Sequence, residues 1–306
     1  GAGGAIFSAI QGSHRRPWGG YSSMRRSEKV EEGEIIEIVG KRVRVALPGG
    51  PAVLPIRAKV VIGDIVTVVD DVVVEAQDRR TVLRRGSKVG VREVCANASA
   101  LLVVCATLEP PFRPGLVDRI LASAEEAGLV GGVVLNKCDL GMPEEVLERL
   151  ALYEDLGYPI FLVSAMQEKG LDKLQEFLKG HTTVLVGHSG VGKSSLFNAL
   201  APGRARVVGD LDPEGRGRHT TTGGILVELP TGGRLIDLPG IREFGLEHVP
   251  KVELRRCFPE LAPLRCRYAD CLHNGDDGCV VDALVEEGKV DELRLDSYRK
   301  ILEEIS

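Results

Sequence analysis

A glycine-rich stretch that contains one lysine and several serines predicts the most specific chemistry in this chain. It runs Gly187-His188-Ser189-Gly190-Val191-Gly192-Lys193-Ser194-Ser195 and fits the phosphate-binding pattern G-x-x-x-x-G-K-[ST]. Glycines let backbone N–H groups turn inward around phosphate oxygens, and a helix N-terminus adds a positive dipole end. The pattern predicts that Lys193 reaches the β- and γ-phosphates of a nucleotide and that the Ser194 hydroxyl coordinates Mg²⁺.

The residues on either side of this loop predict the elements that must hold it. Residues 182–186 form a short β-branched and apolar run, which predicts a strand. Leu196, Phe197 and Leu200 recur at helical spacing after the loop. Strand, loop and helix are the context that the motif requires, so this interpretation is favoured over an ordinary glycine-rich surface turn.

A second polar cluster follows the predicted strand at residues 130–135. It is Asn136-Lys137-Cys138-Asp139 and resembles the N-K-x-D element of GTPases. A carboxylate at Asp139 can accept hydrogen bonds from N1–H and the 2-amino group of guanine, a donor pair that adenine lacks. The resemblance implies that Asn136 braces the site and contacts the base, that the Lys137 stem lies along the base, and that Cys138 is the variable position.

Two further short segments match the same type of site. Ser164-Ala165, after the predicted strand at residues 160–163, resembles the GTPase element whose backbone N–H contacts guanine O6. Asp237-Leu238-Pro239-Gly240 resembles the D-x-P-G element, in which the aspartate holds Mg²⁺ through water and the Gly240 N–H senses the γ-phosphate. Either segment alone is equally compatible with a polar loop.

A run of three threonines lies between the phosphate loop and the D-x-P-G element. Thr220, Thr221 and Thr222 resemble the first switch of GTPases, in which one hydroxyl completes the Mg²⁺ shell. The sequence leaves open which of the three binds the metal. His219 stands directly before them.

The order of these segments differs from that of ordinary small GTPases, because the base-reading elements precede the phosphate loop. With this order and these motifs, residues 31–306 closely resemble the circularly permuted, ribosome small-subunit-dependent GTPases of the RsgA (YjeQ) family. The resemblance implies an α/β P-loop GTPase core that is circularly permuted, an N-terminal β-barrel of the oligonucleotide-binding (OB) type and a small C-terminal zinc-binding domain. It also implies binding to the small ribosomal subunit and its rRNA, a role in late subunit maturation, GTP hydrolysis to GDP that the subunit stimulates, and release on hydrolysis.

Ile241 occupies the position at which Ras-like proteins carry the glutamine that orients the attacking water. Isoleucine cannot do this, so the catalytic group must come from elsewhere. His219 is the best candidate, and the family resemblance points the same way. The alternative is a loop histidine that only packs or forms hydrogen bonds.

Cysteine and histidine gather near the C-terminus in the pattern Cys266-x₄-Cys271-x-His273-x₅-Cys279. Three thiolates and one imidazole complete a tetrahedral Zn²⁺ shell with no open position, so we predict one structural ion. Free thiols and a disulfide are the alternatives. Three further cysteines are predicted to be core residues: Cys95, Cys105 and Cys257.

Four segments are predicted from composition and periodicity. Residues 1–30 are expected to be a flexible extension, of which residues 1–23, before Met24, could remain from cloning. The alternative is a basic arm that contacts RNA phosphates. Residues 31–86 carry several short strand patterns and predict the barrel. Residues 87–246, with alternating strands and helices, predict the GTPase domain with a parallel sheet. Residues 247–306 predict the zinc-binding helical domain.

Two groups of basic residues flank these segments. One follows the barrel and the other surrounds the predicted zinc ligands; they are Arg79, Arg80, Arg84, Arg85, Lys88 and Arg92, and Arg255, Arg256, Arg265 and Arg267. Each group is interpreted either as an RNA contact or as a solvated rim.

The composition sets wider limits. The chain has 306 residues, 43% of them hydrophobic, and a net charge of −5, which excludes a uniformly basic nucleic-acid binder. No apolar run approaches the length of a membrane span. Seven cysteines beside a nucleotide motif favour a reducing compartment, so we expect a cytoplasmic protein. We also expect it to be a monomer. An RNA-binding scaffold that uses nucleotide only as a structural ligand is the second hypothesis, and an ATPase or metabolic kinase is the third.

Overall fold

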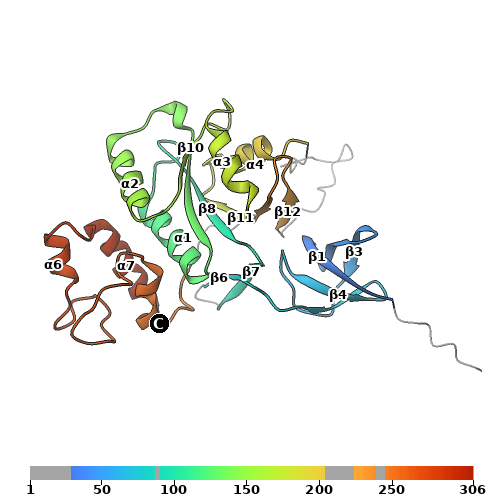
Figure 1. Ribbon diagram of the computed structural model, residues 1–306, viewed down its shortest axis with the longest axis horizontal. Helices are drawn as coiled ribbons and strands as arrows, with labels where there is room; N and C mark the ends of the chain where they lie inside the picture. The colour runs from blue at the N-terminus through green and yellow to red at the C-terminus, as the bar shows by residue number, and fades with distance from the viewer. Residues whose placement is uncertain (1–28, 87–89, 204–223, 239–244, 306) are drawn as a thin grey trace, which may run out of the picture.

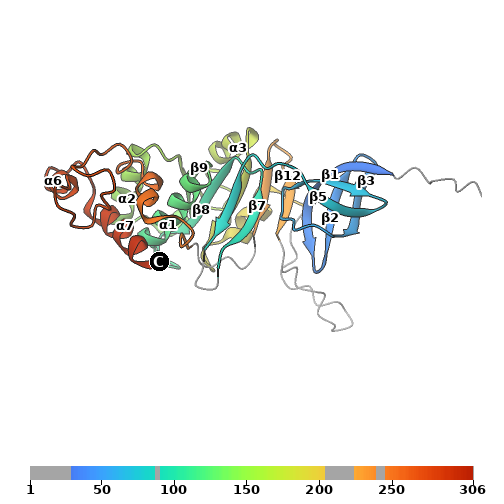
Figure 2. The ribbon, with the colours of Figure 1, turned by 90° about the horizontal axis from the view of Figure 1, so that it is seen from below.

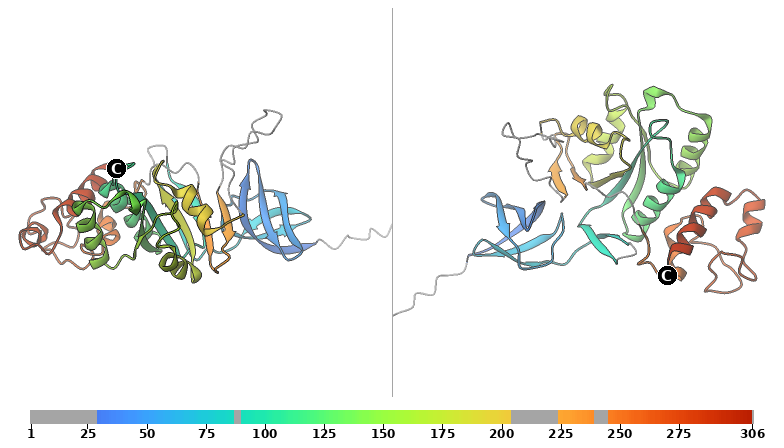
Figure 3. Two further views of the ribbon diagram at one scale, coloured as in Figure 1. Left: turned by 90° about the horizontal axis from the view of Figure 1, so that it is seen from above. Right: turned by 180° about the vertical axis from the view of Figure 1, so that it is seen from behind.

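The computed structural model describes residues 29–86, 90–203, 224–238 and 245–305 (Figure 1). A small barrel, a central sheet covered by helices and a helical C-terminal part follow one another along the longest axis (Figure 2). The barrel and the C-terminal part lie at opposite ends of the central sheet (Figure 3).

Five strands form the barrel. They are β1 (Val30–Val39), β2 (Arg42–Leu47), β3 (Gly50–Pro55), β4 (Ile65–Val69) and β5 (Val72–Ala76). β1 pairs antiparallel with β2 and β4, which pair in turn with β3 and β5. A parallel bridge from Ile56 to Val73 joins the two open ends. The small β-barrel predicted from several short strand patterns is confirmed, and it has five strands.

The strand patterns inside the barrel follow burial closely. Val43 and Val45 of β2 are fully buried, as their alternation with arginine predicts. β1 has no comparable apolar pattern because its inward positions include Gly33. A Cβ at Gly33 would lie 2.5 Å from Val45 Cγ1, so the close approach of β1 and β2 requires glycine there.

The central sheet has the strand order β10-β9-β8-β11-β13-β12. Its strands are β8 (Ala100–Ala106), β9 (Val130–Asn136), β10 (Ile160–Leu162), β11 (Thr182–Gly187), β12 (Ile225–Glu228) and β13 (Arg234–Asp237). The first five strands in this order run parallel, and β12 is antiparallel to β13. The predicted parallel sheet is confirmed, with β12 as an antiparallel addition.

Helices cover both faces of this sheet. They are α1 (Pro114–Glu126), α2 (Glu144–Asp155), α3 (Leu171–Lys179) and α4 (Lys193–Leu200). Leu101 and Val103 of β8 belong to the hydrophobic cluster that contains α1 and α2 residues, whereas Leu102 and Val104 belong to the cluster with α3 and α4. The continuous apolar run of β8 is explained by burial on both sides.

The barrel and the central sheet are joined through β1 and β12. Glu37 pairs with Ile225, and Ile38 N–H donates to Gly224 O at 3.3 Å. The Arg234 guanidinium also donates to both carboxylate oxygens of Glu34, at 2.7 and 2.6 Å. One hydrogen-bonded sheet therefore runs from the barrel into the core. The predicted limits at residues 86 and 246 stay predictions.

A hairpin that the strand patterns did not predict follows the barrel. It consists of β6 (Val82–Arg85) and β7 (Arg92–Ala96). Arg79 beside it hydrogen-bonds the fully buried Asp64 at 2.6 Å and pairs with Glu93 at 3.0 Å. The hydrogen bond from Arg79 lowers the pKa of the Glu93 carboxyl. At least one residue of this basic group therefore serves the fold.

The C-terminal part packs on the central core. Its helices are α5 (Lys251–Leu254), η2 (Arg255–Cys257), α6 (Val281–Glu286) and α7 (Glu292–Glu304). Its hydrophobic cluster includes Ala122 of α1. The apolar side chains at helical spacing along α7 and directly after it are all buried: Leu295, Tyr298, Leu302 and Ile305. None of the helices in the described ranges is long and apolar enough to cross a membrane.

A buried charge network holds α7 on α1. Arg294, 1% exposed, donates to Asp118 at 2.9 Å and to Glu260 at 2.7 and 3.1 Å. Asp118 also accepts hydrogen bonds from Tyr153 at 2.7 Å and Ser297 at 2.6 Å. Each buried charge is therefore paired and hydrogen-bonded, which is the condition under which buried ions are tolerated.

Asp118→Ala should strongly destabilise the protein because it leaves the Arg294 charge buried with only Glu260 as an anionic partner. We expect a loss of about 3–5 kcal/mol in the free energy of unfolding, measured by chemical denaturation. Asp296→Ala, on the exposed side of α7, is the control and should change stability by less than about 0.5 kcal/mol. Equal effects of the two variants would contradict this role of the network.

Candidate functional sites

The phosphate-type loop lies between β11 and α4, as predicted. Gly190 and Gly192 both have φ of +87°, a conformation that L side chains rarely adopt. Gly187 cannot be replaced without a shift, because a Cβ there would lie 2.4 Å from Val104 O. α4 begins at Lys193, so the N–H groups of its first turn have no partner within the helix and are available to an anion.

One buried side chain brings three of the predicted segments together. Asn136, 2% exposed at the end of β9, donates from Nδ2 to Val191 O at 2.9 Å in the phosphate-type loop. Its Oδ1 accepts a hydrogen bond from Ala165 N–H at 3.0 Å. A Cβ on Gly192 would lie 2.3 Å from Nδ2, so glycine is needed for this approach.

A cavity of about 500 Å³ opens over this junction. Its described lining combines the loop with single residues from neighbouring segments: Lys137, Met166, Gly187, His188, Ser189, Gly190, Gly192, Lys193, Ser194, Ser195 and Leu238. Lys193 forms an ion pair with the mostly buried Asp237, so the predicted phosphate and metal groups lie side by side.

Of the other predicted base-site residues, Lys137 lines this cavity, whereas Asp139 and Ser164 are not part of its described lining. Lys137 adopts a left-handed conformation with φ of +62°, and Asp139 is exposed on η1 (Cys138–Leu140). Ser164 is 1% exposed, and its hydroxyl accepts a hydrogen bond from Gln167 N–H at 3.2 Å. The predicted catalytic histidine His219, the threonines Thr220, Thr221 and Thr222, and Gly240 lie outside the described residues.

The sequence interpretation missed a segment that contacts two lining residues of the cavity. Lys137 Nζ donates to Glu109 O at 2.5 Å, and Arg113 Nη1 lies 3.4 Å from His188 Nε2. Both contacts come from the segment between β8 and α1. The available signal was its position at the carboxyl end of a buried parallel strand, where ligands of open α/β sheets bind.

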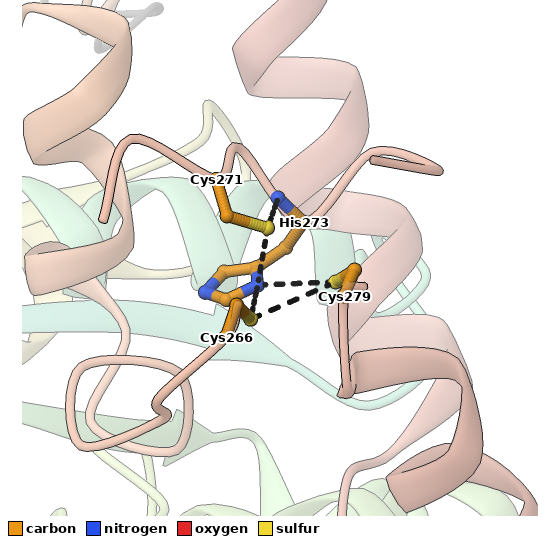
Figure 4. A group of neighbouring side chains, drawn as sticks. All are labelled: Cys266, Cys271, His273 and Cys279. Atoms are coloured by element: carbon orange, nitrogen blue, oxygen red, sulfur yellow. Dashed lines mark hydrogen bonds between the residues drawn. The ribbon is translucent and has the colours of Figure 1, made fainter. Parts of the chain in front are cut away.

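The predicted metal ligands converge in the C-terminal part (Figure 4). The ligand atoms of Cys266, Cys271, His273 and Cys279 all lie within 4.8 Å of one another. His273 presents Nδ1 to the three sulfurs at 3.5, 3.7 and 3.4 Å, and two of the sulfurs are 3.9 Å apart. A tetrahedral Zn²⁺ with bonds of about 2.3 Å to sulfur and about 2.0 Å to nitrogen would separate its ligands by about 3.5–3.8 Å. The cluster therefore fits that ion.

Burial shifts the pKa of two of these groups in opposite directions. Burial, followed by the charge of Arg255, lowers the pKa of His273, which keeps the imidazole neutral and able to act as a ligand. Burial raises the pKa of the Cys271 thiol to about 12, so several thiolates would not form here without a compensating positive ion.

The loops around this cluster are held by α7. Tyr298 donates to Leu272 O at 2.7 Å, and Arg299 donates to His273 O at 3.1 Å. Asp276 accepts hydrogen bonds from Leu272 N–H and Asn274 N–H, both at 3.1 Å. Such contacts orient the groups that would bind a metal.

The sequence that forms these sites is similar to those of known GTPases. A family model described as RsgA GTPase matches residues 76–247, more than half of the chain. The small ribosomal subunit biogenesis GTPase RsgA of Shewanella oneidensis is 42% identical over 219 residues, which cover 70% of this chain and 62% of that protein. The protein of the same name in Pseudomonas putida is 43% identical over 238 residues, which cover 76% of this chain and 69% of that protein.

Two solved structures resemble the whole arrangement. The crystal structure of YjeQ from Thermotoga maritima has a TM-score of 0.73 and 28% identity, and the match covers 90% of this chain and 99% of that chain. YloQ, a circularly permuted GTPase, has a TM-score of 0.67 at 24% identity, covers 92% of this chain and 96% of that chain, and supports the fold alone.

Proposed function

Because this chain belongs to the RsgA GTPase family, we propose that it is a GTPase of small-ribosomal-subunit biogenesis that hydrolyses GTP to GDP and phosphate. The observation that carries this proposal is the Asn136 side chain, which links the phosphate-type loop to the two predicted base-reading segments. A nucleotide held at both ends requires those segments to be fixed relative to each other.

The proposed roles follow the positions of the residues. The N–H groups of residues 189–194 surround the phosphates and Lys193 neutralises their charge. Lys193 pairs with Asp237 in this structure, and we infer that it exchanges this partner for phosphate. Ser194, one of the threonines 220–222 and Asp237, through water, would hold Mg²⁺, which when bound neutralises charge on the β- and γ-phosphates.

Base selection is assigned to the segments beside Lys137. Asp139 accepts from N1–H and the 2-amino group of guanine, and the Ala165 N–H donates to O6. The Ala165 N–H already donates to Asn136 Oδ1 in this structure. Guanine O6 would therefore share this N–H with Asn136, or it would accept a hydrogen bond from a neighbouring backbone N–H. Cys138, between Lys137 and Asp139, is not assigned a chemical role.

The remaining assignments concern the reaction and its setting. His219 is proposed to position or activate the attacking water, since Ile241 cannot. The subunit is proposed to stimulate this step, and hydrolysis to release the protein. The barrel and the C-terminal basic residues would contact rRNA, one Zn²⁺ would stabilise the C-terminal part, and the protein would act in the cytoplasm as a monomer.

GTP hydrolysis should be slow for the protein alone and increase at least about tenfold with small subunits, but not with large subunits. His219→Ala should reduce the stimulated rate by about 10²–10⁴-fold while leaving GDP affinity unchanged. Phosphate release in the three conditions measures this. Turnover at tens per second without subunits would contradict the proposed dependence, and nucleotide binding without turnover would support the scaffold hypothesis.

Asp139→Asn should lower GTP affinity at least about tenfold, because an amide N–H would then face guanine donors. It should raise the affinity for xanthosine triphosphate, whose base has an acceptor at that position. Competition binding with GTP, xanthosine triphosphate and ATP tests both effects. Asp172→Asn, exposed on α3, is the control, and an unchanged base preference in Asp139→Asn would refute the assignment.

Metal analysis of the purified protein should find one zinc per chain. Cys271→Ser should lose most of the metal because three ligands replace four, and it should lower the melting temperature. Cys257→Ser, a buried cysteine outside the cluster, should retain full zinc content. A content far below one zinc per chain in the unmodified protein would rule out the structural ion.

A further inference from the structure

The segment between β8 and α1 contacts Lys137 of the cavity and lies next to the phosphate-type loop. Lys137 Nζ binds Glu109 O, and Pro110 Cδ lies 3.5 Å from the position that a Cβ on Gly190 would take. Arg113, the last residue before α1, therefore lies beside the phosphate-type loop.

Arg113 is held there by an imidazole. His188 Nδ1 lies 2.9 Å from Ser189 O, and because a carbonyl oxygen can only accept, Nδ1 carries the proton. The unprotonated Nε2, 3.4 Å from Arg113 Nη1, is then the acceptor for the guanidinium. The contact joins a permanent cation to a ring that lines the cavity.

The charge of Arg113 is not neutralised by this contact. Lys193 is paired with Asp237, and Lys137 is bound to a backbone carbonyl. Arg113 is exposed, and among the described residues its side chain has no hydrogen bond or ion pair with a carboxylate. A guanidinium in this state binds phosphate oxygens well, because its planar donors match them in geometry and charge.

We propose that Arg113 is a catalytic residue that binds the terminal phosphate of the triphosphate in cis, and that His188 is the positioning residue that aims it. This inference rests on the proposed GTP site. GTP carries more negative charge than GDP at the end of the phosphate chain, so Arg113 should distinguish the two nucleotides.

The proposed contribution to hydrolysis is electrostatic. A water oxygen forms a bond to the γ-phosphorus, the bond from that phosphorus to the β–γ bridging oxygen breaks, and GDP leaves with the electron pair. The proton of the attacking water goes to the phosphate product or to solvent. Arg113 donates hydrogen bonds to the γ-phosphate oxygens and transfers no proton.

The test compares Arg113→Gln with the unmodified protein in GDP affinity, affinity for a non-hydrolysable GTP analogue, and subunit-stimulated kcat. We expect GDP affinity to change less than about twofold, analogue affinity to fall about tenfold and kcat to fall at least about tenfold. Lys173→Gln, which removes an exposed cation from α3, should change none of these. Retained GDP affinity also shows that the variant is folded.

The positioning role of His188 has its own readout. His188→Phe removes the acceptor and should reproduce part of the loss in analogue affinity and kcat, whereas His188→Gln offers an amide acceptor and should restore most of it. In the Arg113→Gln background, His188→Phe should add no further loss. Independent, additive effects would overturn the positioning role.

Two failures can be told apart. If the unmodified protein binds neither GDP nor the analogue, the proposed function itself is wrong. If it binds both and Arg113→Gln weakens them equally, or changes neither affinity nor kcat, only the role of Arg113 is wrong.

Discussion

The two hydrogen bonds of the Asn136 amide are the constraint on which the nucleotide site depends. The amide carries a donor and an acceptor on one planar group, so it binds a carbonyl of one loop and an N–H of another at the same time. Because the amide is buried, loss of either partner would leave an unsatisfied polar atom, which costs about 1–3 kcal/mol. The glycine at position 192 follows from the same contact, since any side chain would collide with the amide.

The C-terminal part is also held by a few contacts, and these come from one helix. A single helix, α7, carries Arg294 toward the central core and Tyr298 and Arg299 toward the loops of the metal cluster. The metal cluster and the core are therefore both held by neighbouring turns of one helix. The C-terminal part is stabilised in this way by its own hydrophobic cluster, by one buried charge network and by a set of ligands that fits a structural ion.

Much of this arrangement could be predicted from local pattern. The β8 run, the phosphate-type loop and the spacing of Cys266, Cys271, His273 and Cys279 each reflect a short-range rule, and the structure places them accordingly. β1 and the β6–β7 hairpin were not predicted individually, because glycine and charged residues obscure their alternation. The partners of Arg294 and Arg113 could not be predicted, since each contact joins segments far apart in the chain and charge alone does not specify a partner.

The pairing of β1 with β12 has a mechanical consequence. β12 begins two residues after the segment that contains the three threonines, and its neighbour Gly224 accepts a hydrogen bond from the barrel. Rotation of the barrel must either carry this strand along or break the ladder between them. Energetic coupling between two such regions acts equally in both directions. A displacement of the barrel and a rearrangement at the start of β12 are therefore coupled through this ladder.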